Sequence, residues 1–197
     1  MEKLPSDVFI SILGFMESKD LQVASLVSKQ WNAATKKAFA RLAQVYESNP
    51  ALTSYVQEAQ KGIQGAGWEN NLLRVKHVFQ HVMGRAKEVG IQEKVSLENL
   101  AVVASKIPQA EDENLIQFFK KVPRAPLFYN AKEIKEWMGK NQESLKQVQN
   151  LAPHHCQLKG LPKEIRYFTA LQTLFFSNNQ LTALPKALES VPIAGLL

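Results

Sequence analysis

The C-terminal quarter of the chain repeats itself, and this repeat constrains the fold more than any other feature of the sequence. From Leu145 onward, residues coincide in type with those found 23 positions later. The coincident pairs are Val148 with Leu171, Leu151 with Leu174, Cys156 with Asn179, Leu158 with Leu181, Leu161 with Leu184, Pro162 with Pro185 and Ile165 with Leu188. A fixed period of this length indicates stacked units, each of which buries its apolar face only against the next.

The second copy carries the fuller pattern. Its residues Leu171-x-x-Leu174-x-Phe176-x-x-Asn179-x-Leu181-x-x-Leu184-Pro185 resemble the leucine-rich repeat, whose period is about 20 to 29 residues. The resemblance implies a short strand and a return segment in each copy, with Asn179 satisfying backbone groups where the chain leaves the strand. The preceding copy resembles the family less, because Pro153 replaces the second apolar residue of its strand.

Side chains that face the open surface of such strands are the candidate target contacts. They alternate along a strand, and solenoids usually bind through their concave surface. We expect these contacts to be His154, Thr173, Phe175 and Ser177, together with Asn150 and Ala152. For Phe175, the alternative is that it packs under a neighbouring helix.

The array is short for an independent fold. Leu197 lies 23 positions after Leu174, so the sequence predicts that the chain stops where a third strand begins. Two units are marginal, because about three or more are generally needed. Either the helical middle covers them, or the array is a shortened form of a longer one.

The N-terminal segment, residues 4 to 45, is predicted to form three short helices. Val8, Ile12 and Met16 recur at helical spacing, and Ser28 can cap a third helix that carries Trp31. The segment has more large apolar side chains than so small a module buries, which is typical of a partner surface. The alternative is an ordinary helical core that packs internally.

The order of these residues is informative. Leu4-Pro5-x-Asp7, Ile12-Leu13, Asp20-Leu21 and Val27-Ser28-Lys29-x-Trp31 resemble the F-box family, and Met16 is the one departure from its pattern. The resemblance implies an adaptor, not an enzyme, that binds a Skp-type protein of a cullin–RING ubiquitin ligase and docks a target onto it. By position, the residues that contact the Skp-type protein are Leu4, Pro5, Leu26, Val27 and Trp31.

An F-box joined to repeats of this type also resembles effectors that bacteria place in host cells, which implies the host cytosol as the place of action. Two other functions stay open: a scaffold that delivers no target, and a cysteine-dependent enzyme that uses Cys156. The motif His154-His155-Cys156 is a poor metal site, because three adjacent residues cannot supply a tetrahedral ligand set. We expect Cys156 to point inward with a structural role, and we expect no metal or cofactor.

The middle of the chain, residues 46 to 143, is predicted to be helical, with breaks at glycines and prolines that include Gly90 and Pro108. An apolar stripe is expected at Leu72, Val75, Phe79, Val82, Met83 and Ala86. His77 and His81 have the spacing of a zinc pair, but Val78 stands where the metalloprotease motif has Glu. A solvated basic face is favoured, with an acidic partner as the alternative.

Composition limits the remaining classes. The 197 residues carry a net charge of +6 and a single cysteine, so no intramolecular disulfide can form. No apolar run approaches the roughly 18 residues of a membrane span, and the N-terminus lacks a signal pattern. We expect a cytoplasmic protein that binds neither membrane nor nucleic acid. The predicted fold is mainly α: an F-box at 1–45, a helical linker at 46–143 and an α/β leucine-rich-repeat segment at 144–197.

Overall fold

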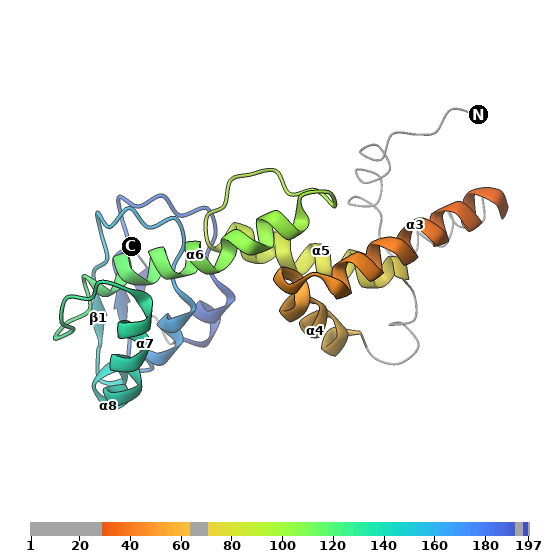
Figure 1. Ribbon diagram of the computed structural model, residues 1–197. Helices are drawn as coiled ribbons and strands as arrows, with labels where there is room; N and C mark the ends of the chain where they lie inside the picture. Colours follow the sequence, from red (N-terminus) through yellow and green to blue (C-terminus); the bar gives the residue numbers. More distant parts are fainter. Residues whose placement is uncertain (1–28, 64–70, 192–194, 197) are drawn as a thin grey trace. The chain divides into compact units, whose positions relative to one another are not determined.

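The computed structural model describes residues 29–63, 71–191 and 195–196 (Figure 1). This part of the chain is mainly helical, which confirms the predicted class. Its described residues form two compact units: the N-terminal unit of residues 29–63, 71–83 and 94–105, and the C-terminal unit of residues 84–93, 106–191 and 195–196. Two of the three borders lie within helices, and the third lies between these two helices. The boundaries expected after residues 45 and 143 stay predictions.

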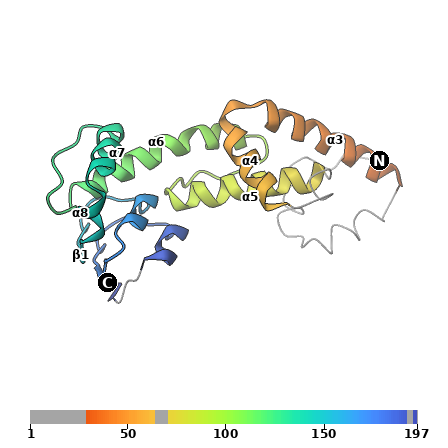
Figure 2. The ribbon, with the colours of Figure 1, turned by 90° about the horizontal axis from the view of Figure 1, so that it is seen from below.

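The N-terminal unit is a cluster of helices (Figure 2). It contains α3 (Lys29–Ser48), the 3-10 helix η1 (Pro50–Leu52), α4 (Thr53–Gly62) and the first parts of α5 (Asn71–Glu88) and α6 (Leu100–Phe119). The Asn49 side chain caps η1 by accepting the N–H of Ala51 at 2.9 Å. The buried apolar side chains of the N-terminal unit are Phe39, Ala43, Tyr46, Leu52, Ala59, Val75, Val78, Val82, Leu100, Val103 and Ala104.

The buried face of α5 differs from the predicted stripe. Val75, Val82 and Ala86 are buried as expected, but Met83 is 45% exposed and Val78 is 2% exposed. Val75, Val78, Val82 and Ala86 follow the three-and-four spacing of one helical face, whereas Met83 lies about a quarter turn from Val82. Met83 therefore lies off the buried face of α5, whereas Val78, which is not part of the predicted stripe, lies on it.

The helix α5 ends where the sequence places a break, but α6 continues through its predicted break. Gly90 has φ +80°, and the N–H groups of Gly90 and Ile91 donate to the carbonyls of Lys87 and Ala86. Pro108, by contrast, lies inside α6 on an exposed position. An interior proline costs a helix about 3 kcal/mol. Burial of neighbouring side chains such as Ile107 offsets that cost.

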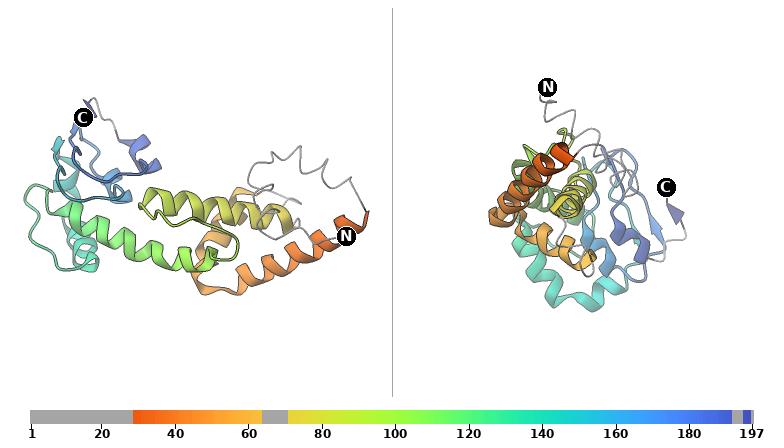
Figure 3. Two further views of the ribbon diagram at one scale, coloured as in Figure 1. Left: turned by 90° about the horizontal axis from the view of Figure 1, so that it is seen from above. Right: turned by 90° about the vertical axis from the view of Figure 1, so that its right-hand side faces the viewer.

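The C-terminal unit adds α7 (Ala131–Lys140), α8 (Gln142–Lys146) and a three-stranded parallel sheet in the order β1 (Asn150–Leu151), β2 (Thr173–Leu174), β3 (Gly195–Leu196). The 3-10 helices η3 (Lys163–Tyr167) and η4 (Lys186–Ser190) return the chain between strands. Figure 3 shows the successive turns, from teal to blue, lying side by side.

The strand register agrees with the sequence repeat at the first pairing and departs from it at the second. Leu151 stands opposite Leu174, a shift of 23 residues. Leu174 stands opposite Leu196, a shift of 22, because the second copy is one residue shorter between its paired strands. The expectation that Leu197 aligns with Leu174 is therefore wrong by one residue, and a third strand is present.

One apolar core joins the helices of this unit to the repeats. Leu115, Phe118 and Phe119 of α6 belong to the same buried cluster as Leu151 and Leu174 of the strands. Aromatic rings fill the junction, with the Phe118 centroid 6.0 Å from that of Phe168 in an edge-to-face arrangement. Helices of the middle segment therefore pack on the repeated segment.

A buried asparagine ties three segments of this unit together. Asn114 of α6 is 6% exposed, and its Oδ1 accepts the N–H groups of Lys159 and Gly160, both at 3.1 Å. Its Nδ2 donates to the carbonyl of Val89 at 3.1 Å. Gly160 fits here because a Cβ would collide with the backbone of Glu88 and Val89. Three backbone polar groups of this junction thus depend on a single side chain.

None of the helices in the described part combines the length and apolarity that a membrane span requires.

Replacing Asn114 with leucine should destabilise the protein strongly. Asn114→Leu leaves the N–H groups of Lys159 and Gly160 without an acceptor, and an unsatisfied buried donor costs about 1 to 3 kcal/mol. We expect the free energy of unfolding in urea to fall by about 2 to 5 kcal/mol. Gln117→Leu on the same helix is the control, because Gln117 is half-buried and bonds the exposed Lys120. Equal losses in both variants would contradict this role for Asn114.

Candidate functional site

The candidate target-binding surface, here called the strand face, consists of Asn150, Ala152, His154, Thr173, Phe175 and Ser177. Its residues alternate with side chains that point into the core, including Leu151 and Leu174. Asn150, His154, Phe175 and Ser177 are exposed, and Ala152 and Thr173 are half-buried. Phe175 is 38% exposed, so it is not packed beneath a helix. Binding by this face stays a prediction.

Backbone hydrogen bonds hold the two copies of the strand face in register. The Phe175 N–H donates to the Leu151 carbonyl at 2.9 Å, and the His155 N–H donates to the Ser177 carbonyl at 3.3 Å. The Thr173 hydroxyl donates to Oδ1 of Asn150. The rings of His154 and His155 meet edge to face at 5.7 Å. The face is therefore a fixed platform that carries the phenyl ring of Phe175 and the imidazole of His154, with the imidazole of His155 beside it.

Asn179 fixes the turn that follows both strands. Its Oδ1 accepts the N–H groups of Cys156 at 3.1 Å and Leu158 at 3.0 Å. Its Nδ2 donates to the carbonyls of Pro153 and Phe176, both at 2.7 Å. This is the role that the repeat pattern predicts for the asparagine, and it extends across two copies.

Cys156 occupies the position of Asn179 in the preceding copy, and its thiol points inward. The residue is 6% exposed, and its Sγ donates to the His154 carbonyl at 3.4 Å. Burial raises the pKa of the thiol, and the positive charges of Lys121 and Lys120 offset only part of this effect. A protonated, buried thiol is a poor nucleophile and a poor metal ligand.

One histidine of α5 lies near a glutamate of α4. His81 Nδ1 lies 3.8 Å from the carboxylate of Glu58, and Arg74 pairs with Glu47 at 2.5 Å. Desolvation lowers the pKa of His77, and His81 and Lys76 lower it further. Within the residues that the structure describes, no cluster of three or more His, Cys, Asp or Glu side chains could hold a metal ion.

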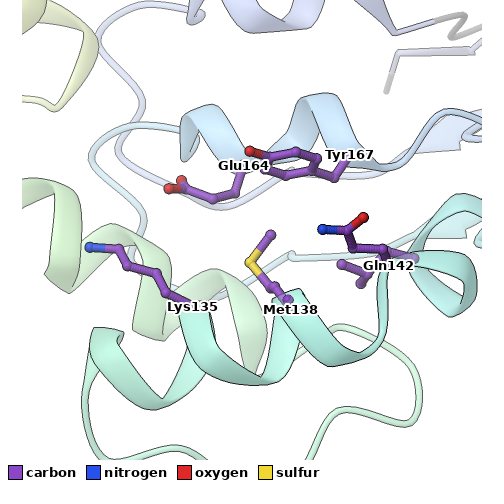
Figure 4. A pocket seen from close by; sticks show the side chains of 7 residues that line it. Lys135, Met138, Gln142, Glu164 and Tyr167 are labelled. Atoms are coloured by element: carbon purple, nitrogen blue, oxygen red, sulfur yellow. The ribbon is translucent and has the colours of Figure 1, made fainter.

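A shallow pocket lies between α7, α8 and η3 (Figure 4). Met138, Leu145 and Tyr167 supply apolar surface, and Lys135 and Glu164 approach from opposite sides. Its volume of about 200 Å³ is smaller than the roughly 300 Å³ at which small-molecule pockets begin, and suits one side chain. The Lys135 ammonium donates a hydrogen bond to Oδ1 of Asp112, with Nζ and Oδ1 2.9 Å apart. This hydrogen bond raises the pKa of Lys135.

Two exposed apolar residues escape the sequence analysis. Leu127 and Tyr129, in the segment between α6 and α7, are 82% and 88% exposed. The sequence treats this segment only as a break between helices. The sequence does carry one signal, which is the run of three large apolar residues Leu127-Phe128-Tyr129. In an extended segment successive side chains alternate in direction, and here only Phe128 packs against the core.

One of the five predicted ligase-binding residues belongs to an element of the structure. Leu4, Pro5, Leu26 and Val27 lie outside the described residues, as do the first two predicted helices. Trp31 lies on α3, which begins at Lys29, directly after the predicted cap at Ser28.

The turn fixed by Asn179 should be sensitive to its loss. Asn179→Ala removes the five hydrogen bonds of this side chain, among them those that it accepts from the N–H groups of Cys156 and Leu158. We expect the free energy of unfolding to fall by about 2 to 4 kcal/mol. Asn150→Ala, which removes an exposed amide that bonds one hydroxyl, serves as the control and should cost less than about 1 kcal/mol. A neutral Asn179→Ala variant would show that this turn is held by other contacts.

The single cysteine makes thiol reactivity a direct readout of the C-terminal unit. Because burial raises the pKa of Cys156, the thiolate fraction at a given pH is smaller in the folded protein than in the unfolded chain. We expect iodoacetamide at pH 8 to alkylate the native protein at least about 10-fold more slowly than the urea-unfolded protein. Mass spectrometry follows the reaction. Equal rates would contradict an inward, buried thiol.

Comparison with known proteins identifies one region of the chain. Residues 1–38 match the family model of the F-box domain. No curated protein and no solved structure shows a significant match to the chain. The expected resemblance to bacterial effectors and the cytosolic location stay predictions. F-box domains bind the Skp-type protein of cullin–RING ubiquitin ligases and in general belong to substrate adaptors, and residues 1–38 of this chain are such a domain.

Proposed function

We propose that this protein is a substrate adaptor, in which the F-box domain binds the ligase and the C-terminal unit binds the target. The observation that carries the proposal is the F-box match at residues 1–38. By position in the motif, Leu4, Pro5, Leu26, Val27 and Trp31 make the contact with the Skp-type protein. Aromatic anchors such as Trp31 commonly dominate binding energy at interfaces.

The second part of the proposal is that the C-terminal unit is a short leucine-rich-repeat module. Support comes from its parallel strands, whose paired leucines Leu151 and Leu174 are both buried. Further support comes from Asn179, which bonds the backbone of both copies. Solenoid units commonly bind proteins through the open side of their strands. The strand face is accordingly the proposed target surface.

Such an adaptor works by proximity. Holding the target on the same complex as the ubiquitin-charged enzyme turns a bimolecular encounter into an intramolecular one. This service needs two binding surfaces and no bond chemistry from the adaptor. The buried thiol of Cys156, whose pKa is raised, supports this function over the cysteine-dependent enzyme.

The ligase contact is tested by affinity for a purified Skp-type protein. Leu4→Ala and Trp31→Ala each remove an apolar anchor, and a hot-spot residue commonly contributes about 2 kcal/mol or more. We expect each change to weaken the complex about 30-fold or more. Isothermal titration calorimetry on the full chain measures this loss.

The matched control is Leu127→Ala, which truncates an exposed leucine outside the F-box domain. It should leave the affinity for the Skp-type protein within about 2-fold of the unmodified chain. A wild-type chain that does not bind, or Leu4→Ala and Trp31→Ala variants that bind as tightly as the wild type, would overturn the proposed ligase contact.

A further inference from the structure

The segment that joins α6 to α7, residues 120–130, forms an exposed loop beside β1 (Figure 1). We call it the 120–130 loop. Leu127 and Tyr129 are 82% and 88% exposed, the highest values among the exposed large apolar residues of the described part. Two such side chains, separated by one residue, present a contiguous apolar edge. Apolar edges rimmed by polar residues commonly mark sites of protein contact.

The loop is held in place rather than loose. The ring of Phe128 points inward, with its centroid 6.1 Å from that of Phe119 and 5.8 Å from that of Trp137. At the start of the loop, the Ala125 N–H donates to the Val122 carbonyl at 3.2 Å. Because Phe128 is anchored, its neighbours Leu127 and Tyr129 face outward. Little ordering entropy remains to be lost when a partner binds.

The end of the loop is fixed by a capping box. Asn130 accepts the Glu133 N–H at 2.9 Å, and Glu133 returns the bond by accepting the Tyr129 N–H at 3.0 Å and the Asn130 amide at 2.8 Å. Both carboxylate oxygens of Glu133 are thereby occupied. Glu133 is also the first acidic residue after Glu113 in the sequence.

The charge of the loop is positive. Lys120, Lys121 and Arg124 are exposed, and no salt bridge within the described residues involves them. Lys120 donates to the uncharged Gln117. Two acids of α6 pair with other cations, since Glu111 pairs with Arg85 and Lys163, and Asp112 pairs with Lys135. The third, Glu113, is exposed and accepts a hydrogen bond from the Gln109 amide. Exposed cations without carboxylate partners favour an anionic ligand.

The loop adjoins the strand face. Val122 of the loop belongs to the same buried cluster as Leu151 of β1 and as Cys156, the residue that directly follows His154 and His155. The positive charges of Lys120 and Lys121 offset part of the rise that burial causes in the pKa of the Cys156 thiol. The stretch from residue 144 to residue 163 contains no aspartate or glutamate, and neither does the stretch from 165 to 188. The basic loop and the strand face thus form one surface from which carboxylates are nearly absent.

We infer that this combined surface binds an acidic segment of a target protein that carries at least one large apolar side chain. The carboxylates pair with Lys120, Lys121 and Arg124, and the apolar side chain lies against Leu127 and Tyr129. A nucleic acid would satisfy the charges but leave Leu127 without a partner. The inference rests on the proposed function in one respect: it takes the ligand to be a segment of the target protein.

Selection from a library of random short peptides displayed on phage, with the full chain as bait, tests this inference. We expect the enriched sequences to contain several aspartates or glutamates around a large apolar residue. Fluorescence anisotropy with the most enriched peptide should show at least about 10-fold weaker binding to Leu127→Ser/Tyr129→Ser and to Lys120→Glu/Lys121→Glu. Binding to the wild-type chain should weaken as salt is added, because exposed charges are screened.

The matched control is Lys132→Glu/Lys140→Glu, which reverses two exposed lysines of α7 and makes the same change in net charge. It should bind the peptide within about 3-fold of the wild type. Thermal melts of each variant show that the fold is intact, and single changes replace any double variant that fails to fold. Enrichment of basic or neutral peptides, no enrichment, preference for single-stranded DNA, or equal losses in the control would each overturn the inference. The affinity of the loop variants for the Skp-type protein should be unchanged. This measurement separates failure of the inference, which concerns the target surface, from failure of the proposed ligase contact.

Discussion

Each strand of the C-terminal unit is only two residues long, so no strand can bury its leucine without segments stacked on both sides. This constraint accounts for the parallel register of Leu151 against Leu174 and for the layer of α6 and α7 that covers them. It also accounts for Asn114, whose amide joins α6 to the end of α5 and to the first repeat. A short array without such a cover would expose its apolar core.

The same constraint determines which surface is left for binding. The helices and 3-10 turns of the C-terminal unit bury the inward side chains of the strands, so the outward ones are left exposed. His154 and Phe175 stand on a backbone whose positions are fixed by Asn179 and by hydrogen bonds between the copies. Rigid platforms of this kind lose little conformational freedom on binding, which favours recognition of a protein segment.

Features that depend on residues close together in the sequence can be predicted from it, whereas contacts between distant residues cannot. The 23-residue register, the role of Asn179 and the inward thiol of Cys156 follow from a local repeat and are all found in the structure. Asn114 could not be anticipated, because its partners lie 25 to 46 residues away. Nothing in a single sequence indicates which distant backbone groups a buried amide will satisfy.

Two other departures have equally specific causes. The sequence gives Val78 and Met83 similar apolar weight, and only the rotation of α5 against its neighbours decides that Val78 is buried. Pro108 signals a break by its own chemistry, yet buried residues around it keep α6 continuous. The prolines of the 120–130 loop indicate only a break between helices, and the sequence does not show that Leu127 and Tyr129 beside them are exposed. For Val78, Met83 and Pro108, tertiary packing overrides the rule that the local sequence suggests.

The central claim is that ligase binding and target binding use separate surfaces of one chain. Hydrogen exchange of the full chain, measured with and without a purified Skp-type protein, tests this claim most directly. The account predicts that slowed exchange is confined to the amides of the F-box domain and of α3, while exchange over residues 144–191 is unchanged. Protection of the strand face by the Skp-type protein, or no protection within residues 1–38, would contradict it.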